Sequence, residues 1–442
     1  MPHALDVDDR APVRRLGPRS PSIPALALAV TLALVAAALL ASSGPSPPTV
    51  PLSSTSAAQV PRASGASNTW TKLSPLTAPS PRQDPLLAFD SRSGRVILFG
   101  GWSTSPIGTV FNDTWSYDPA ANQWTNRTPS THPTIGCSVC FATAAMVYDS
   151  RANRVILFGA SSNPGGQPKP TWAYDPDANT WTPMHPTSTP LAGHDFGIVY
   201  DVAADRVLLF GGGEIAPDMF DVGNNETWSY DYANDAWTRL APAASPPSRF
   251  GGSMAYDLKA DRTFLFGGCT NGDRLWPSCA EANDTWSYDY GANTWTNRSA
   301  AASPPPAVAL PMVYDSLADR LILFGQGWAT GNQTWSYNVT TNLWTAQHPT
   351  VSPPVRSYPG MTYDSVRTQT ILFGGGGPTF LNDTWTYASL GISGGGRPTH
   401  PSEIPVVAWI GIGVVVVAAV AFTAVALWSV RRNRGGPPRG SP

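Results

Sequence analysis

A cassette of two short segments occurs six times along this chain, and this repetition constrains the fold more than any other feature. The first segment ends in Leu-Phe-Gly, and the second contains Thr-Trp. Leu-Phe-Gly begins at Leu98, Leu157, Leu209, Leu265, Leu323 and Leu372. The Thr-Trp segments contain Trp115, Trp172, Trp228, Trp286, Trp335 and Trp385. Because one such unit cannot bury its apolar side chains alone, neighbouring units must stack against one another.

Each unit has the pattern of four strands. In the first unit, an apolar strand (86–90) ends in Asp, a turn follows, and Arg begins a continuous apolar strand (95–99). A variable loop leads to Thr-Trp-Ser-Tyr-Asp, and a last strand carries Trp124. A strand that is apolar throughout is expected where both of its faces are covered. Charged residues make up only 13% of the chain, which also contains 45 Pro and 40 Gly, so short strands and turns are favoured over helices. The sequence predicts an all-β propeller built from four-stranded blades.

The spacing within the units resembles that of kelch repeats. A Gly pair follows the apolar strand, and Tyr precedes Trp by seven residues in five of the units. These pairs are Tyr117/Trp124, Tyr174/Trp181, Tyr230/Trp237, Tyr288/Trp295 and Tyr337/Trp344. The resemblance covers residues 68–390 and implies a kelch-type propeller, a fold that serves many functions. Galactose oxidase is a related propeller enzyme with a copper site of Tyr, His and a Cys-linked Tyr. Those ligands cannot be placed on this sequence, and we expect no cofactor and no metal.

The two ends of the repeat region complement each other. The sixth unit stops at Ala388 without a Trp-containing last strand, whereas the region begins with an unpaired one, residues 68–73, which contains Trp70. We therefore expect this N-terminal strand to complete the last blade, which fixes the number of blades at six. Closing the ring in this way removes the open sheet edges that promote aggregation.

Two hydrophobic segments flank the repeats. Residues 23–41 carry no charge and follow an Arg-containing segment (1–22), so they are either an uncleaved signal-anchor or a signal peptide cleaved near Ala41. Residues 406–430 predict a transmembrane helix, with Trp at both ends and an Arg-rich tail (431–442). The segments 42–67 and 391–405 are predicted linkers. This pattern predicts a cell-membrane protein with an extracytoplasmic propeller and a cytoplasmic C-terminal tail.

The cysteines and glycosylation sequons fit an exported protein. Cys269 and Cys279 lie in one loop, and Cys137 and Cys140 lie between two units, so two local disulfides are expected. A shared zinc site would need ligands from two non-adjacent blades. Candidate glycosylation sites are Asn112, Asn126, Asn225, Asn283, Asn297, Asn332, Asn338 and Asn382. Several of these sequons follow from the repeated Asn-Asp-Thr-Trp pattern itself.

Candidate binding residues lie in the loops between the second and third strands, where the units differ most. Trp102, Trp276 and Trp328 could stack on a sugar or a protein partner, or they could pack against their own loops. The acidic residues of these loops are Glu214, Asp218, Asp221 and Asp273. Four His lie in the connections between units and are expected to be solvated, since their spacing is not that of metal ligands: His132, His185, His194 and His348.

Asp and Arg also recur five residues apart, as in Asp90/Arg95. Such regular copies indicate a structural role, in which Asp bonds to the turn backbone and Arg pairs across the hairpin.

The charge distribution and the motifs narrow the function. The tails 1–22 and 431–442 hold eight of the 28 basic and three of the 30 acidic residues, which leaves a net charge of −7 between them. This acidic middle excludes an ordinary nucleic-acid binder. Because no nucleophile elbow, phosphate loop, zinc-protease motif or paired-carboxylate motif occurs, the leading hypothesis is a binding module for a surface protein or glycan. The alternatives are a carbohydrate-active or metal-dependent enzyme at the central mouth and a structural spacer of the cell envelope.

Overall fold

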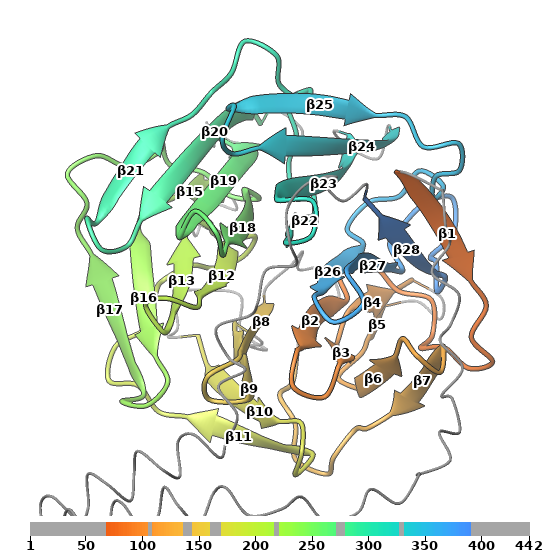
Figure 1. Ribbon diagram of the computed structural model, residues 1–442. Coiled ribbons are helices and arrows are strands. Elements are labelled where there is room, and N and C mark those ends of the chain that lie inside the picture. Colours follow the sequence, from red (N-terminus) through yellow and green to blue (C-terminus); the bar gives the residue numbers. More distant parts are fainter. Residues whose placement is uncertain are drawn as a thin grey trace, which may run out of the picture. The chain divides into compact units, whose positions relative to one another are not determined.

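The computed structural model shows a ring of six four-stranded antiparallel sheets (Figure 1). It describes residues 68–104, 108–135, 144–159, 169–215, 221–270, 279–326 and 331–389. The chain divides into two units, Met1–Arg62 and Ala63–Pro442, and every described residue belongs to the second. The all-β propeller predicted from the repeats is confirmed for the described residues.

Each blade runs outwards from its first strand, because the first strands of neighbouring blades contact one another around the ring. Blades 1 to 3 comprise β2 (Leu86–Asp90), β3 (Arg95–Phe99), β6 (Thr114–Asp118) and β7 (Gln123–Asn126); β8 (Ala145–Asp149), β9 (Arg154–Phe158), β10 (Thr171–Asp175) and β11 (Thr180–Met184); and β12 (Gly197–Asp201), β13 (Arg206–Phe210), β16 (Thr227–Asp231) and β17 (Ala236–Leu240). Blades 4 to 6 comprise β18 (Ser253–Asp257), β19 (Arg262–Cys269), β20 (Glu281–Asp289) and β21 (Thr294–Asn297); β22 (Met312–Asp315), β23 (Arg320–Gln326), β24 (Gly331–Asn338) and β25 (Leu343–Gln347); and β26 (Gly360–Asp364), β27 (Gln369–Phe373), β28 (Thr384–Ala388) and β1 (Thr69–Leu73). Two short hairpins, β4 (Trp102–Ser103) with β5 (Thr109–Val110) and β14 (Gly213–Ile215) with β15 (Asp221–Gly223), extend from blades 1 and 3.

Strand β1 closes the ring as its sequence predicts. It pairs antiparallel with β28, with Trp70 opposite Tyr387. The first strand of the described chain is therefore the outermost strand of the last blade. Residues more than 300 positions apart thus share one sheet, and the ring has no missing strand.

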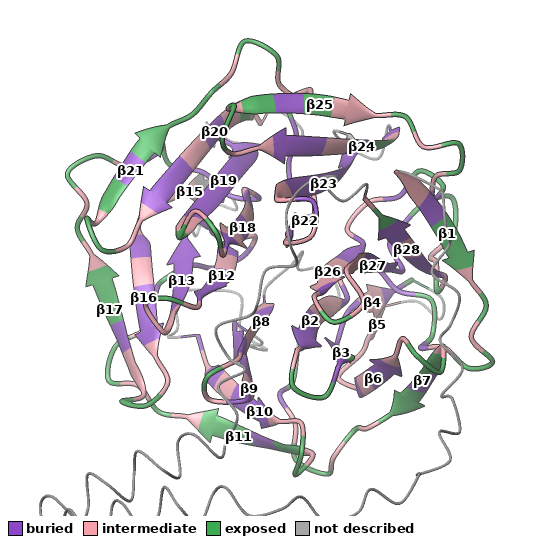
Figure 2. Ribbon diagram, viewed as in Figure 1, coloured by how far each residue is buried: buried purple, intermediate pink, exposed green. Residues whose placement is uncertain are grey.

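The apolar second strands form the core between blades. In β3, Val96, Ile97, Leu98 and Phe99 are all buried, and the equivalent strands repeat this pattern. In β7 only Trp124 is buried, so the outermost strands are largely exposed along the rim (Figure 2). Because neighbouring blades cover both faces of the second strand, a continuous apolar run is required there.

A ring of hydrogen bonds joins each blade to the one before it. The indole nitrogen of the outer-strand Trp donates to the buried hydroxyl of the Thr that stands directly before the third-strand Trp of the preceding blade. The pairs are Trp124–Thr384, Trp181–Thr114, Trp237–Thr171, Trp295–Thr227, Trp344–Thr285 and Trp70–Thr334, with N···O distances of 2.8–3.0 Å. Each of these indoles also packs against a Phe of the preceding blade, as Trp124 does against Phe373. The outer Trp therefore joins blades as well as filling them.

The repeated Asp and Arg residues stabilise the turns, but they do not pair with each other as the sequence suggested. The Oδ1 atom of Asp90 accepts hydrogen bonds from the backbone of Arg92 and Ser93. Arg95 instead pairs with Asp118, at the end of the third strand, at 3.0 Å. The equivalent Arg of blades 2 to 4 also pairs with the Asp at the end of the third strand, as Arg154 does with Asp175. Because the first-strand Asp is committed to the turn, the Arg reaches the neighbouring strand on its other side.

Several predicted segments lie outside the described residues. These are the N-terminal segment to residue 67, both hydrophobic runs and the C-terminal tail. Within the described part of the chain, the structure contains no helix of the length and apolarity needed to span a bilayer.

Candidate functional site

The two faces of the ring are built differently. On one face lie the short turns between strands 1 and 2 and between strands 3 and 4. There, Tyr hydroxyls donate to the Asn or Asp five residues later, as in Tyr117–Asn122 and Tyr200–Asp205. On the other face lie the strand 2–3 loops and the crossovers between blades. We call these the turn face and the loop face.

On the loop face, the crossovers meet in a ring around the axis. In five of the six blades, the backbone turns through a positive φ six residues before the Asp that ends the first strand; the equivalent position of blade 2 lies outside the described residues. This occurs at Asp84, Asp195, Gly251, Ala309 and Tyr358, with φ between 48° and 66°. Backbone bonds join neighbouring positions: Asp84 N to Tyr358 O (2.9 Å), Gly251 N to Asp195 O (2.6 Å) and Ala309 N to Gly251 O (2.7 Å). Because the innermost strands begin directly after these residues, the ring forms the loop-side mouth of the central channel. We call it the mouth ring.

Two carboxyl groups and a phenol gather in the mouth ring. Burial raises the pKa of Asp84 to about 8, and the charge of Asp195 adds to this effect, while a hydrogen bond from Trp102 opposes it. Burial and the charges of Asp195 and Asp84 likewise raise the pKa of Tyr358. Each of the three residues nevertheless keeps some accessible surface. They are thus largely enclosed by protein.

Trp102 contacts one of these three residues, Asp84, through a hydrogen bond. Its indole nitrogen donates to Oδ2 of Asp84 at 2.9 Å, and its ring packs edge-on against Phe380 with centroids 5.4 Å apart. Its backbone also exchanges two hydrogen bonds with Gln83. Its side-chain contacts are thus with the crossover and with the blade 6 loop rather than with its own loop, and its role in binding stays a prediction. Trp276 and Trp328 lie outside the described residues.

His194 is buried rather than solvated, contrary to the expectation for the crossover histidines. Its Nδ1 lies 2.9 Å from Oδ2 of Asp195, and its ring packs against Phe250. The other carboxylate oxygen of Asp195, Oδ1, is buried and has no hydrogen-bond partner in the described part of the chain. His185 and His348 are exposed and His132 is half-buried.

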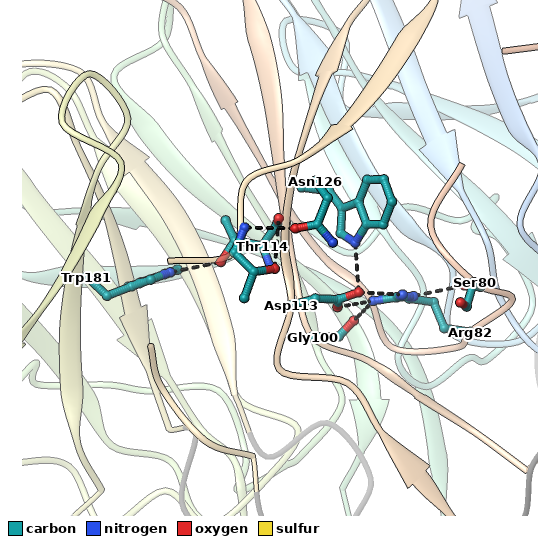
Figure 3. Close-up of polar contacts among 9 residues, drawn as sticks. Ser80, Arg82, Gly100, Asp113, Thr114, Asn126 and Trp181 are labelled. Atoms are coloured by element: carbon teal, nitrogen blue, oxygen red, sulfur yellow. Dashed lines mark hydrogen bonds and ion pairs between the residues drawn. The ribbon is translucent and has the colours of Figure 1, made fainter. Parts of the chain in front are cut away.

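Three buried arginines hold the crossovers against the blades. Arg82, Arg249 and Arg356 stand two residues before mouth-ring positions and are at most 2% exposed. Arg82 donates to both carboxylate oxygens of Asp113, to the Gly100 carbonyl and to the Ser80 carbonyl (Figure 3). The pairs Arg249–Asp284 and Arg356–Asp383 repeat this geometry. Although burial alone raises the pKa of Asp284, Arg249 outweighs it and the pKa falls below its usual value.

The role of these arginines was not identified from the sequence, although the pattern of Arg and Asp in the repeats indicates it. In blades 1, 4 and 6, an Arg stands eight residues before the Asp that ends the first strand. The same three blades carry an Asp two residues before the Trp of the third strand. Blade 3 has Gly193 with Glu226, and blade 5 has Ala307 with Gln333. The two positions therefore change together within one chain, as expected for contacting residues.

The predicted acidic loop residues are only partly placed. Glu214 and Asp221 lie on β14 and β15, and Gly213, next to Glu214, exchanges backbone bonds with His194. This hairpin therefore begins at the mouth ring. Asp218 and Asp273 lie outside the described residues. Among the described residues, no three His, Cys, Asp or Glu side chains are grouped so as to hold a metal ion.

One of the two predicted disulfides can be assessed. Cys269 and Cys279 are joined, with Cα atoms 5.5 Å apart. Cys269 also exchanges backbone bonds with Phe250, so the disulfide anchors its loop beside the mouth ring. Cys137 and Cys140 lie outside the described residues.

The sequons follow from the blade framework. In five of them the Thr is one of the buried residues that accept the indole bond, as Thr114 does after Asn112. Asn126, Asn225, Asn283, Asn297 and Asn382 are exposed, and Asn112, Asn332 and Asn338 are half-buried. Packing therefore accounts for these Thr residues, and glycosylation of the Asn residues stays a prediction.

Known proteins share this architecture. The family model described as "KLHDC2/KLHL20/DRC7 Kelch-repeats domain" matches residues 64–212 and 142–375. The "Rab9 effector protein with kelch motifs" of Xenopus laevis is 24% identical over 179 residues, which span 40% of this chain and 46% of that protein. The aligned part thus covers less than half of the relative. Together with the six-bladed ring, the family match shows that this chain belongs to the kelch-repeat β-propeller family.

Proposed function

We propose that this protein is a membrane-anchored, extracytoplasmic interaction module that binds a protein partner through its loop face. The observation that carries the proposal is the contrast between the two faces. The turn face repeats one set of internally satisfied turns, whereas the loop face differs from blade to blade and surrounds a polar mouth. Variable loops on a rigid scaffold are the usual location of binding residues.

A protein partner is favoured over a glycan. Trp102, one of the three Trp that could stack on a sugar, is already engaged with Asp84 and Phe380. Exposed apolar side chains lie instead on the crossovers, at Leu191 and Val355. The Xenopus relative is named as the effector of another protein, which is consistent with a protein-binding role. The hydrophobic segments 23–41 and 406–430 support the membrane anchoring.

Site-directed photo-crosslinking in the native membrane tests this function. A photoreactive residue is placed at Leu191 or Val355 on the loop face, and at Leu343 or Val366 on the turn face. All four are exposed apolar residues, so the turn-face pair is a matched control. We expect adducts to a protein from the loop-face positions only. Equal labelling from both faces, or none from Leu191 and Val355, contradicts the proposal.

The predicted topology is tested separately by labelling intact cells with an impermeant amine reagent. Lys72 and Lys259, on the propeller, should react before the cells are opened. An epitope added after Pro442 should become accessible to antibody only after the membrane is permeabilised. The opposite pattern contradicts the extracytoplasmic placement.

A further inference from the structure

One blade junction of the turn face departs from the repeated pattern by enclosing a cavity. The cavity measures about 200 Å³ and lies between blades 1 and 2, beside the turns that follow β2 and β10. Its lining includes Arg95, Ile97 and Ser116 from blade 1 and Tyr174 and Asp177 from blade 2. Because pockets for drug-sized molecules measure about 300–1,000 Å³, this smaller cavity suits a ligand with a single ring.

The positive charge of the cavity is only partly neutralised. Arg127, which directly follows β7, also lines the cavity and forms no ion pair within the described part of the chain. Arg95 uses one of its nitrogens for Asp118, at 3.0 Å, although a guanidinium group carries five N–H donors. Burial raises the pKa of Tyr174, so this phenol stays uncharged, and Arg127 only reduces the effect. An anion that enters the cavity therefore meets unused charged donors.

Blade 4 shows how the equivalent residues close this space. Its arginine, Arg298, donates from Nε to Oγ of Ser287 at 3.1 Å. Phe264 stands at the position of Ile97, and its ring packs against that of Tyr337 with centroids 5.6 Å apart. A larger side chain and an internal hydrogen bond thus fill the junction between blades 4 and 5.

Blade 1 has neither of these features. Ile97 is smaller than Phe, and the hydroxyl of Ser116 has no hydrogen-bond partner among the described residues, although Ser116 is only 6% exposed. Because an unpaired polar group in a buried site is costly, a ligand that bonds to this hydroxyl is favoured. The open space and the unused serine are observations separate from the charge of the two arginines.

We propose that this cavity binds a small carboxylate that also carries hydroxyl groups, of the size of one sugar acid such as a hexuronate. Its carboxylate pairs with Arg95 and Arg127, because charge-assisted hydrogen bonds to guanidinium groups are the strongest contacts open to it. Ile97 and Pro176 contact the C–H groups of the sugar ring. Asp177, whose side chain is 62% exposed, accepts hydrogen bonds from the hydroxyl groups. The negative charge of Asp177 also disfavours a divalent anion such as phosphate.

Calorimetric titration of the purified full-length chain tests the proposal. The probe is D-galacturonate, and D-galactose is the uncharged control, since the two sugars differ only at the sixth carbon. Inorganic phosphate is the competing anion, and a galacturonate trimer shows whether the end of an acidic polysaccharide binds better than the free sugar. At neutral pH and low salt we expect galacturonate to bind, galactose not to bind, and phosphate to bind more weakly than galacturonate.

The test substitutions are taken from equivalent positions of other blades, where the same fold accepts them. Arg127→Gln introduces the residue of blade 5, and Ile97→Phe introduces that of blade 4. Arg127→Gln should weaken galacturonate binding about tenfold or more, the loss expected for one charge-assisted hydrogen bond. Ile97→Phe should abolish binding by filling the cavity. Arg298→Gln is the matched control and should leave binding unchanged, because its junction is closed.

Four results overturn the proposal: no binding of galacturonate at about 10 mM, equal affinity for galactose, tighter binding of phosphate, or equal losses in Arg127→Gln and Arg298→Gln. The thermal midpoint of each variant is measured in parallel. If Ile97→Phe does not fold, the half-buried Arg127 still decides the result. The cavity lies on the face opposite the proposed protein-binding surface, so this inference does not rest on a protein partner.

Discussion

At the scale of single residues, the structure assigns different tasks to side chains that look alike in the sequence. The outer-strand Trp of each blade joins two blades through its indole nitrogen, whereas the third-strand Trp bonds within its own blade, as Trp115 does to Asp113. The Thr that receives the inter-blade bond is buried in all six blades. Its hydroxyl therefore has a structural role that its polar character does not suggest.

Thr171→Val tests this role. The substitution keeps the side-chain shape but leaves the buried Trp237 indole nitrogen without its acceptor. We expect a loss of about 1–3 kcal/mol in the free energy of unfolding, measured by urea denaturation. Thr238→Val, on the exposed side of β17, is the control and should change stability by less than about 0.5 kcal/mol. Equal effects of the two substitutions contradict a role for the hydroxyl.

Asp84 should make stability depend on pH. Its pKa is about 8 in the folded protein and near 3.8 when unfolded, so the folded state binds the proton more tightly. The resulting stabilisation is complete below about pH 4 and is lost as the pH rises through 8. The thermal midpoint should therefore fall from about pH 4 to about pH 8 and then level off, and Asp84→Asn should reduce this fall. Because burial also raises the pKa of Asp149, Asp201 and Asp257, the informative quantity is the difference between wild type and variant. Parallel pH profiles refute the assignment.

At the scale of elements, the crossovers are rigid connections. In blades 1, 4 and 6 a buried arginine joins the crossover to the base of the strand 2–3 loop, as Arg82 does through Asp113 and Gly100. Phe111 covers the Arg82 guanidinium, with its ring centroid 3.9 Å away. Since Asp84 and Tyr358 stand two residues after such arginines, the arginines position the groups of the mouth ring.

Arg82→Met should therefore be strongly destabilising. It leaves Asp113 unpaired in a largely buried site, and we expect a loss of about 3 kcal/mol in the free energy of unfolding. Adding Asp113→Asn should recover part of the loss, because the uncompensated charge is then removed. Arg239→Met is the matched control, since Arg239 forms an exposed pair with Glu226 and should contribute less than about 1 kcal/mol. Additive effects of the two blade 1 substitutions argue against a coupled pair.

The sequence predicted the elements better than the site. Repetition revealed the blades, because the buried run Val96–Phe99 and the single buried Trp of the outer strand recur in each unit. It could not reveal that His194 is buried, since this depends on Phe250, from the next crossover along the chain, packing against its ring. The mouth ring was equally hidden, because its members occur once per blade, differ in chemistry and share only a backbone conformation.

At the scale of the whole molecule, closure depends on one strand. Strand β1 covers the edge of β28, and Trp70 packs against Phe324 of blade 5 and Tyr387 of its own blade. Without it, the last blade would have three strands, and β28 would become its outer edge. An open edge of this kind readily pairs with another chain.

Deleting residues 68–73 should therefore change the association state as well as stability. We expect the variant to form concentration-dependent oligomers, detected by light scattering during size-exclusion chromatography, and to unfold at lower urea concentration. Deleting the same number of residues from the preceding segment, 50–55, is the control and should leave both properties unchanged. A monomeric, equally stable β1 deletion contradicts the role of this strand in closure.

The pairing of β1 with β28 also has a consequence in time. Trp70 is synthesised early, but its partner Tyr387 follows 317 residues later. At about 5–20 residues per second, the first strand waits on the order of 15–60 s for its place in the sheet. During this interval Trp70 has neither Thr334 nor β28 available, and the last blade cannot form. The ring is thus completed only after nearly the entire propeller has left the ribosome, so a factor that shields β1 during synthesis would increase the yield of folded protein.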